Sequence, residues 1–184
     1  MSSLDISANR AAQKWTRREQ VGRILWALVS PLFRLSPRPL WGWRRMLLNL
    51  FGAKIGQDVH IYPTVRVTIP WNLDIGDEAA VGDHAILYAL GPIRIGSQAT
   101  VSQYAHLCAG GHDYINPAMT LTKPEIIIGS GAWVCADAYV GGGVTIGEKA
   151  IAAARSVVVK DVPDNVVVGG NPATPIKTRA PKDA

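Results

Sequence analysis

Four histidines occur in the chain, and one of them lies where a catalytic base could act. The imidazole of histidine titrates near neutral pH, so an accessible ring can take a proton from a reacting hydroxyl. His112 follows two glycines and directly precedes the longest interruption of the repeat described below. A loop that leaves a rigid scaffold is a common location for catalytic side chains. His112 is therefore the first candidate for a general base, although an isolated histidine is usually only a solvent-exposed side chain.

The elements that must position this residue follow a period of six. Fifteen positions at that spacing are aliphatic, and glycine follows seven of them. These positions are Ile55, Ile61, Val67, Ile75, Val81, Leu87, Ile95, Val101, Leu107, Ile128, Val134, Val140, Ile146, Ala152 and Val158. Helices repeat every 3.6 residues and strands every 2.0, so neither explains the spacing. The pattern predicts a triangular solenoid of stacked coils, with the aliphatic residue inside and a small residue four places later at the corner. The adjacent glycine is expected to permit unusual backbone angles.

This repeat also predicts how the chain is divided. The expected coils are 55–72, 75–92, 95–112, 128–145 and an incomplete 146–163. Two-residue insertions at 73–74 and 93–94 are expected at corners, and 113–127 is expected to protrude as a loop. The predicted parts are a helical N-terminal arm (1–52), the solenoid domain (53–170) and a C-terminal tail (171–184).

Several longer motifs go beyond the six-residue repeat. They are Pro70–Gly76, Leu90–Gly96, Gly111–Tyr114, Ile128–Val134, Arg155–Pro163 and Gly170–Ala173. On these motifs the chain resembles the hexapeptide-repeat acyltransferases, most of all the sugar O-acetyltransferases of the colanic-acid and nodulation type, over roughly residues 45–178. The resemblance implies a left-handed parallel β-helix and a homotrimer with each site between two subunits. It also implies acetyl transfer from acetyl-CoA to a sugar or glycan hydroxyl, in exopolysaccharide or another surface glycan.

The same resemblance implies roles for individual residues. His112 is implied as the catalytic base. The residues that match coenzyme-contact positions are Trp133, Ala136, Ala154, Val159, Lys160 and Lys177. Two more coenzyme contacts are expected from residue chemistry alone: Gly142 as a small wall residue of the last two coils, and Arg155 as a nearby cation. The residues implied to contact the acceptor are Asp83, His84 and Tyr88. Small side chains suit a groove for the thin pantetheine arm, and Lys and Arg suit its phosphates.

Three positions depart from the pattern of the resembling enzymes. Val159 replaces the usual Thr, and Gly142 stands where Pro is common. Neither change is expected to prevent coenzyme binding. Ala89 stands where close relatives often have Asn, which leaves the acceptor open, so a non-sugar acceptor remains an alternative.

A zinc site is a second alternative, because a related β-helix family, the γ-class carbonic anhydrases, binds zinc with three histidines. Three imidazoles and a water would suit zinc. However, His84, His106 and His112 occupy different phases of the coil, and His106 and His112 are expected at successive corners. We therefore expect no metal. A third alternative is a trimer that serves only as a scaffold.

The N-terminal arm carries the positive charge of the chain. Residues 1–50 hold nine Lys or Arg against two Asp or Glu, together with four of the six Trp. Helices are predicted at about 11–29 and 40–51, after a loose segment at 1–12, with Pro31 as a break. The favoured role of the arm is to cap the open end of the first coil. Contact with an anionic membrane is compatible with that role. No nucleic-acid-binding motif accompanies the charge, so no nucleic acid partner is expected.

The expected location is the cytoplasm, at most peripheral at the inner membrane face. Cys108 and Cys135 are expected on different units of adjacent coils and not to form a disulfide. No run approaches the ~18 apolar residues of a membrane span. No signal peptide is recognised.

Overall fold

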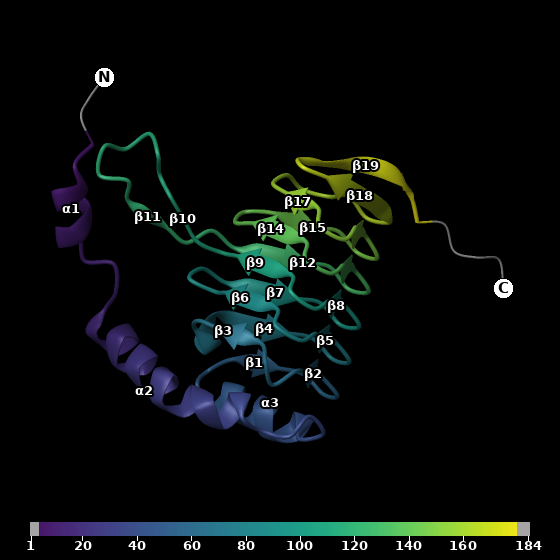
Figure 1. Cartoon of the computed structure of the whole chain (residues 1–184), viewed down its shortest axis with the longest axis horizontal. Helices are drawn as coiled ribbons and strands as arrows, with labels where there is room; N and C mark the ends of the chain where they lie inside the picture. The colour runs from purple at the N-terminus through teal and green to yellow at the C-terminus, as the bar shows by residue number, and fades with distance from the viewer. Residues whose placement is uncertain (1–3, 180–184) are drawn as a thin grey trace.

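The computed structural model describes residues 4–179. In this range three α-helices precede a stack of short strands that climbs coil by coil (Figure 1). The helices are α1 (Ile6–Ala11), α2 (Arg17–Arg34) and α3 (Trp41–Leu50), and a single 3₁₀ turn, η1 (Pro70–Asn72), lies in the first coil.

Three parallel sheets form the walls of the solenoid. Sheet A holds β1 (Lys54–Ile55), β4 (Leu73–Ile75), β7 (Ile93–Ile95), β12 (Ile126–Ile128) and β15 (Thr145–Ile146). Sheet B holds β2 (His60–Ile61), β5 (Ala80–Val81), β8 (Thr100–Val101), β13 (Trp133–Val134), β16 (Ile151–Ala152) and β18 (Val166–Gly170), with β19 (Ala173–Thr178) added antiparallel at its end. Sheet C holds β3 (Arg66–Val67), β6 (Ile86–Tyr88), β9 (His106–Cys108), β14 (Tyr139–Gly141) and β17 (Val157–Val158).

The strand register confirms the period of six. Ile55 pairs with Ile75, Ile75 with Ile95, Ile95 with Ile128, and Ile128 with Ile146, so equivalent residues lie directly above one another. Thirteen of the fifteen aliphatic positions are buried, and the other two, Ile55 and Val67, are half-buried. All seven alanines found four places later are also buried. Stacking therefore creates one continuous apolar core that no single coil could form.

The glycines act differently from the expectation. The left-handed backbone angle falls three residues after the aliphatic position, at Glu78 (φ +58°) and Gln98 (φ +58°) among others. A Cβ on Gly76 would instead lie 2.6 Å from the backbone N of Ser97 in the next coil. These glycines therefore allow neighbouring coils to approach closely, and the prediction that they supply unusual angles was wrong.

The insertions also lie elsewhere than predicted. Residues 73–74 and 93–94 belong to β4 and β7, in the straight walls. The extra length is accommodated in the preceding corner, where η1 forms in the first coil. The long insertion does protrude, as a hairpin of β10 (Gly111–His112) and β11 (Leu121–Thr122). It begins before residue 113, and the chain has already rejoined the wall in β12 at Ile126.

Helices α2 and α3 cover the bottom of the first coil (Figure 1). Trp26, Phe33, Leu47 and Leu48 are buried in the same core as the solenoid. The prediction of α2 was wrong at both ends, because Thr16 and Glu19 form a capping box that starts the helix at Arg17. Pro31 lies inside the helix rather than breaking it; the Ala27 carbonyl that Pro31 cannot bond accepts a hydrogen bond from the Ser30 hydroxyl at 3.2 Å.

The two ends of the chain are more regular than expected. Residues 6–11, within the segment predicted to be loose, form α1. The predicted last strand is β18, and the following segment, expected to lie over the last coils, pairs with it as β19. Two parts of these predictions lie outside the described residues. They are the loose segment at 1–3 and the end of the tail at 180–184.

Candidate active site

His112 is exposed on the first strand of the hairpin. Its Nδ1 lies 2.6 Å from the backbone carbonyl oxygen of Met119, on the opposite arm of the same hairpin. A carbonyl oxygen can only accept a hydrogen bond, so Nδ1 carries the proton. In the neutral ring the second nitrogen, Nε2, then keeps its lone pair free to accept a proton. The hairpin therefore holds this imidazole in the tautomer that a general base requires.

The base of the hairpin packs tightly on the solenoid. A Cβ on Gly91 would collide with the backbone carbonyls of Lys123 and Pro124, and one on Gly142 would collide with the Pro124 ring. Glu125 Oε1 also pairs with Arg94 Nε at 2.6 Å across the exposed wall. Gly142 thus has a packing reason to lack a side chain, which explains why Pro is absent at this position.

The predicted site residues gather on two edges of the solenoid. The hairpin edge, where sheet C turns into sheet A, carries His112, Gly142, Val159 and Lys160, and Tyr88 lies beside it at the end of β6. The far edge, where sheet B turns into sheet C, carries Asp83, His84, Ala136, Ala154 and Arg155. Trp133 and Lys177 lie on sheet B itself, in β13 and β19. Arg155 on the far edge and Lys160 on the hairpin edge are five positions apart in the chain, with β17 between them, and extended chain of that length spans on the order of 15 Å.

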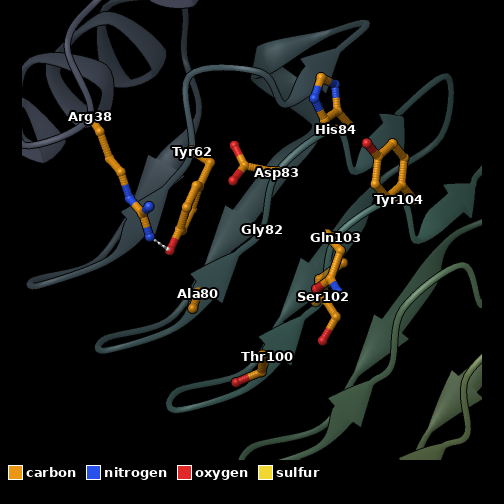
Figure 2. Close-up of a pocket in the computed structure, with 11 residues that line it drawn as sticks. Arg38, Tyr62, Ala80, Gly82, Asp83, His84, Thr100, Ser102, Gln103 and Tyr104 are labelled. Atoms are coloured by element: carbon orange, nitrogen blue, oxygen red, sulfur yellow. Dashed lines mark hydrogen bonds between the residues drawn. The ribbon is translucent and has the colours of Figure 1, made fainter.

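The far edge carries a polar hollow of about 630 Å³ (Figure 2). Thr64 Oγ1 donates to Asp83 Oδ1 at 2.8 Å, and the ring of His84 stacks on Tyr104 with centroids 5.0 Å apart. Arg38, from the segment between α2 and α3, reaches the same hollow and hydrogen-bonds to the Tyr62 hydroxyl. Asp83 and His84 therefore do line a cavity, whereas Tyr88 and His112 do not contribute to it.

Sequence reasoning missed most of the residues that line this hollow, among them its one arginine and both of its tyrosines. Arg38, Tyr62 and Tyr104 were not singled out. Tyr104 sits at the same corner position as His84, one coil further on, so the six-residue period was a usable signal for it. Arg38 lies between α2 and α3. It comes near residue 83 only because these two helices pack against the first coil, and the six-residue period does not predict that packing.

Comparison with known proteins identifies a similar acetyltransferase. No protein-family model matches the chain. The chain is 46% identical over 157 residues to WcaF of Escherichia coli K12, which is named as an acetyltransferase of colanic acid biosynthesis. The match covers 85% of this chain and 86% of WcaF.

The chain belongs to the hexapeptide-repeat acetyltransferases of the WcaF type.

Solved structures agree with this family in fold. A hexapeptide-repeat acetyltransferase of Vibrio cholerae in complex with acetyl coenzyme A matches with a TM-score of 0.83 and 22% identity, covering 92% of this chain and 93% of that one. A galactoside acetyltransferase in complex with coenzyme A also matches with a TM-score of 0.83 and 22% identity, covering 95% and 89%. The predicted left-handed parallel β-helix is confirmed.

The side chains expected to contact coenzyme are mostly open to solvent in this acetyltransferase. Val159 is 53% exposed and Trp133 is 44% exposed. The indole Nε1 of Trp133 donates to Ser102 Oγ at 2.8 Å, which fixes its ring against sheet B. Arg155 Nε lies 3.5 Å from Asp137 Oδ2, so its charge is already partly balanced. Lys160 and Lys177 are exposed.

The three histidines considered for zinc lie on separate parts of the acetyltransferase. His84 is on the far edge, and His112 is on the hairpin. His106 lies within β9, not at a corner as predicted, and packs edge-on against Tyr88 and Tyr139. Burial lowers the pKa of His106. Across residues 4–179, no three His, Cys, Asp or Glu side chains gather as a metal site would need.

Neither cysteine is paired in the structure. Cys108 and Cys135 are both free thiols, and burial raises the pKa of the Cys135 thiol. A raised pKa leaves less of the reactive thiolate at neutral pH. Cys135 is therefore poorly suited to serve as a nucleophile.

Proposed function

We propose that this acetyltransferase moves an acetyl group from acetyl-CoA to a sugar hydroxyl of an exopolysaccharide or other surface glycan, with His112 as the general base. The observation that carries the proposal is the hydrogen bond between His112 Nδ1 and the Met119 carbonyl, which leaves Nε2 free on an exposed ring. Two resembling proteins support the substrate classes: WcaF is named for colanic acid, and the Vibrio protein was crystallised with acetyl coenzyme A.

The proposed reaction needs one proton acceptor and no covalent enzyme intermediate. Nε2 of His112 takes the proton of the acceptor hydroxyl while its oxygen attacks the thioester carbonyl carbon. The carbon–sulfur bond then breaks, and the imidazolium returns the proton to the departing coenzyme thiolate. Backbone N–H groups near the thioester would stabilise the negative oxygen of the tetrahedral intermediate.

Assembly as a homotrimer is part of the proposal. Asp83 and His84 lie on the far edge, whereas His112 lies on the hairpin edge of the same chain. Because sheet C separates the edges, an acceptor in contact with both sets of residues must lie between two copies. A ring of three subunits would place the hairpin edge of each copy against the far edge of the next.

The His112→Ala variant tests the catalytic assignment. General-base catalysis typically contributes ~10²–10⁴-fold, so turnover should fall by about that factor. Acetyl-CoA affinity, measured by calorimetry, should change little because no coenzyme contact is removed. His60→Ala is a matched control, since His60 is stacked on Trp41 in the cap. Full turnover in His112→Ala would refute the base. A panel of sugar and non-sugar acceptors, assayed with the wild type, would identify the acceptor class.

We further propose that the arm contacts an anionic membrane surface on the cytoplasmic side. Helix α2 buries Trp26 and Phe33 on one side, yet its other side is also apolar and exposed. The exposed apolar residues of α2 and its C-terminal end are Val21, Ile24, Leu25, Leu28, Leu32 and Leu35. Exposed arginines flank this surface at both ends of the helix, including Arg17, Arg18 and Arg34. Apolar side chains between cations suit the interface of an anionic bilayer.

No helix within residues 4–179 combines the length and apolar character needed to cross a membrane. The proposed contact is therefore peripheral.

Liposome co-sedimentation tests the membrane contact. The wild type should pellet with anionic vesicles at low salt and less at high salt, because screening weakens the arginine contribution. Leu28→Glu should abolish pelleting by placing a charge at the centre of the apolar surface. Ile176→Glu, at another exposed apolar site at the other end of the solenoid, serves as the control. Wild-type protein that stays in the supernatant at low salt would contradict the proposal.

A further inference from the structure

Helix α1 lies against the tip of the β10–β11 hairpin, away from the other two helices (Figure 1). Asp5 donates its backbone N–H to the Pro117 carbonyl at 2.8 Å. Lys123, on the returning arm, donates to the Lys14 carbonyl at 3.0 Å and lies 3.7 Å from the centre of the Trp15 ring. The N-terminal segment therefore lies along the hairpin that carries His112, from the tip to the end of the returning arm.

One side chain of α1 reaches the same atom that orients His112. Asn9 Nδ2 donates to the Met119 carbonyl oxygen at 2.6 Å and to the neighbouring Ala118 carbonyl at 2.7 Å. The Met119 oxygen thus accepts two hydrogen bonds, one from Asn9 and one from His112 Nδ1. A carbonyl oxygen has two lone pairs, so both donors can be accommodated.

The backbone at this point needs support. Met119 adopts a φ of +44°, in the left-handed region that residues with a side chain rarely occupy. Asn9 holds the carbonyls of the two peptide groups on either side of the Met119 Cα, which fixes the direction of the Met119 oxygen.

The orientation of the Asn9 amide is itself determined. Its Oδ1 accepts a hydrogen bond from Lys14 Nζ at 2.7 Å, so the NH₂ group must face the hairpin. Asn9 is half-buried, whereas its neighbours on α1 are exposed. A six-residue helix is too short to be stable alone, so α1 owes its order to these contacts.

We propose that Asn9 is a positioning residue for the general base, and that α1 is a strap that holds the catalytic hairpin in its working geometry. The inference rests on the proposed role of His112. Asn9 fixes the Met119 carbonyl, the carbonyl fixes the proton on Nδ1, and Nε2 is left free toward the acceptor. Asn9 touches no reacting atom.

Asn9→Ala tests the proposal. A hydrogen bond of this kind contributes about 0.5–1.5 kcal/mol, so turnover should fall by about two-fold to about thirteen-fold while the KM for acetyl-CoA stays unchanged. Asn9→Asp, which is the same size but faces the carbonyls with acceptors only, should lose at least as much. Arg10→Ala is the matched control, because Arg10 lies on the same helix and makes no hydrogen bond or ion pair within residues 4–179.

Two further readouts separate positioning from a structural role. The ring ¹⁵N shifts of His112 should report a single Nδ1-protonated tautomer in the wild type and a mixture in Asn9→Ala. In a His112→Ala background, Asn9→Ala should have no further effect on the residual turnover. Unchanged turnover in Asn9→Ala, or a loss that persists without His112, would overturn the inference. If His112→Ala alone keeps full turnover, the proposed base is wrong and this inference falls with it, so the two failures are distinguishable.

Discussion

His106 is the side chain whose burial makes stability depend on pH. It lies half-buried between the rings of Tyr88 and Tyr139, and desolvation lowers its pKa from the ordinary 6.5. The unfolded chain therefore binds a proton at His106 more readily than the folded chain does. Its contribution to stability is complete above about pH 6.5 and is lost as the pH falls below that value toward the lowered pKa.

We predict that the melting temperature falls on acidification through this range, and that His106→Gln reduces the fall. Glutamine cannot take up a proton there, so the variant lacks the His106 contribution to proton linkage. Differential scanning fluorimetry from about pH 7.5 to about pH 5 measures both slopes. Equal slopes in the wild type and the variant would show that His106 does not contribute.

Arg44 is one of the nine basic residues counted in the arm, but its charge is not on the surface. It is fully buried, and its guanidinium donates to the Ile61 carbonyl at 2.5 Å, the Ser36 hydroxyl at 2.8 Å and the carbonyls of Pro37 and Arg38 at 2.9 and 2.6 Å. Burial lowers its pKa. One of the nine basic residues of the arm therefore ties the cap to the first coil and cannot contribute to a membrane surface.

At the scale of the elements, we predict that replacing glycine by alanine changes stability in opposite directions at two positions, Gly76 and Gly42. Gly76→Ala should lower the free energy of unfolding by about 1–3 kcal/mol, because the new Cβ would push against the backbone of Ser97 in the next coil. Gly42→Ala should raise it by about 0.5–1 kcal/mol, because Gly42 lies inside α3 with no atom within 4 Å of the new Cβ. Urea unfolding of the two variants beside the wild type measures both changes. Equal effects would contradict the close-approach explanation.

The walls of the solenoid could be predicted from the sequence because each coil repeats the same steric demand. Ile75, Ile95 and Ile128 face the same interior, so their spacing appears directly in the sequence. The function of the adjacent glycines could not be predicted in this way, because the atom that excludes a side chain at Gly76 belongs to a residue twenty-one positions later.

The candidate site could be predicted only in part. The interruption after residue 112 marked His112, but the carbonyl that orients it comes from Met119, whose position depends on the hairpin register. The Asn9 contact joins residues about 110 positions apart and leaves no periodic signal. Which corner carries which residue follows from the period, whereas the packing of helices on corners does not.

For the whole molecule, we predict that two inactive variants complement each other. His112→Ala damages the hairpin edge, and Ala154→Trp blocks the far edge, so each pure protein should be inactive. In randomly mixed trimers, roughly a quarter of the sites would combine an intact hairpin edge from one copy with an intact far edge from another. Co-refolding the pair and measuring acetyl transfer tests this expectation. Light scattering of the wild type should give about three times the 19.8 kDa of one chain.

A mixture that stays inactive although trimers form would show that each site lies within one subunit. An active monomer would contradict the shared site altogether.

The contacts of α1 with the hairpin can form only late in folding, because they join residues far apart in the sequence. Paired strands in the solenoid are mostly about twenty residues apart, so each coil can close on the previous one as synthesis proceeds. Asn9 is made well before its partners at 118 and 119, which emerge more than a hundred residues later. The scaffold can therefore be largely assembled before the proposed base is oriented, and refolding should restore the β-sheet signal before it restores full turnover. The enzyme would thus reach its full rate only when α1 has docked on a hairpin made much later in the chain.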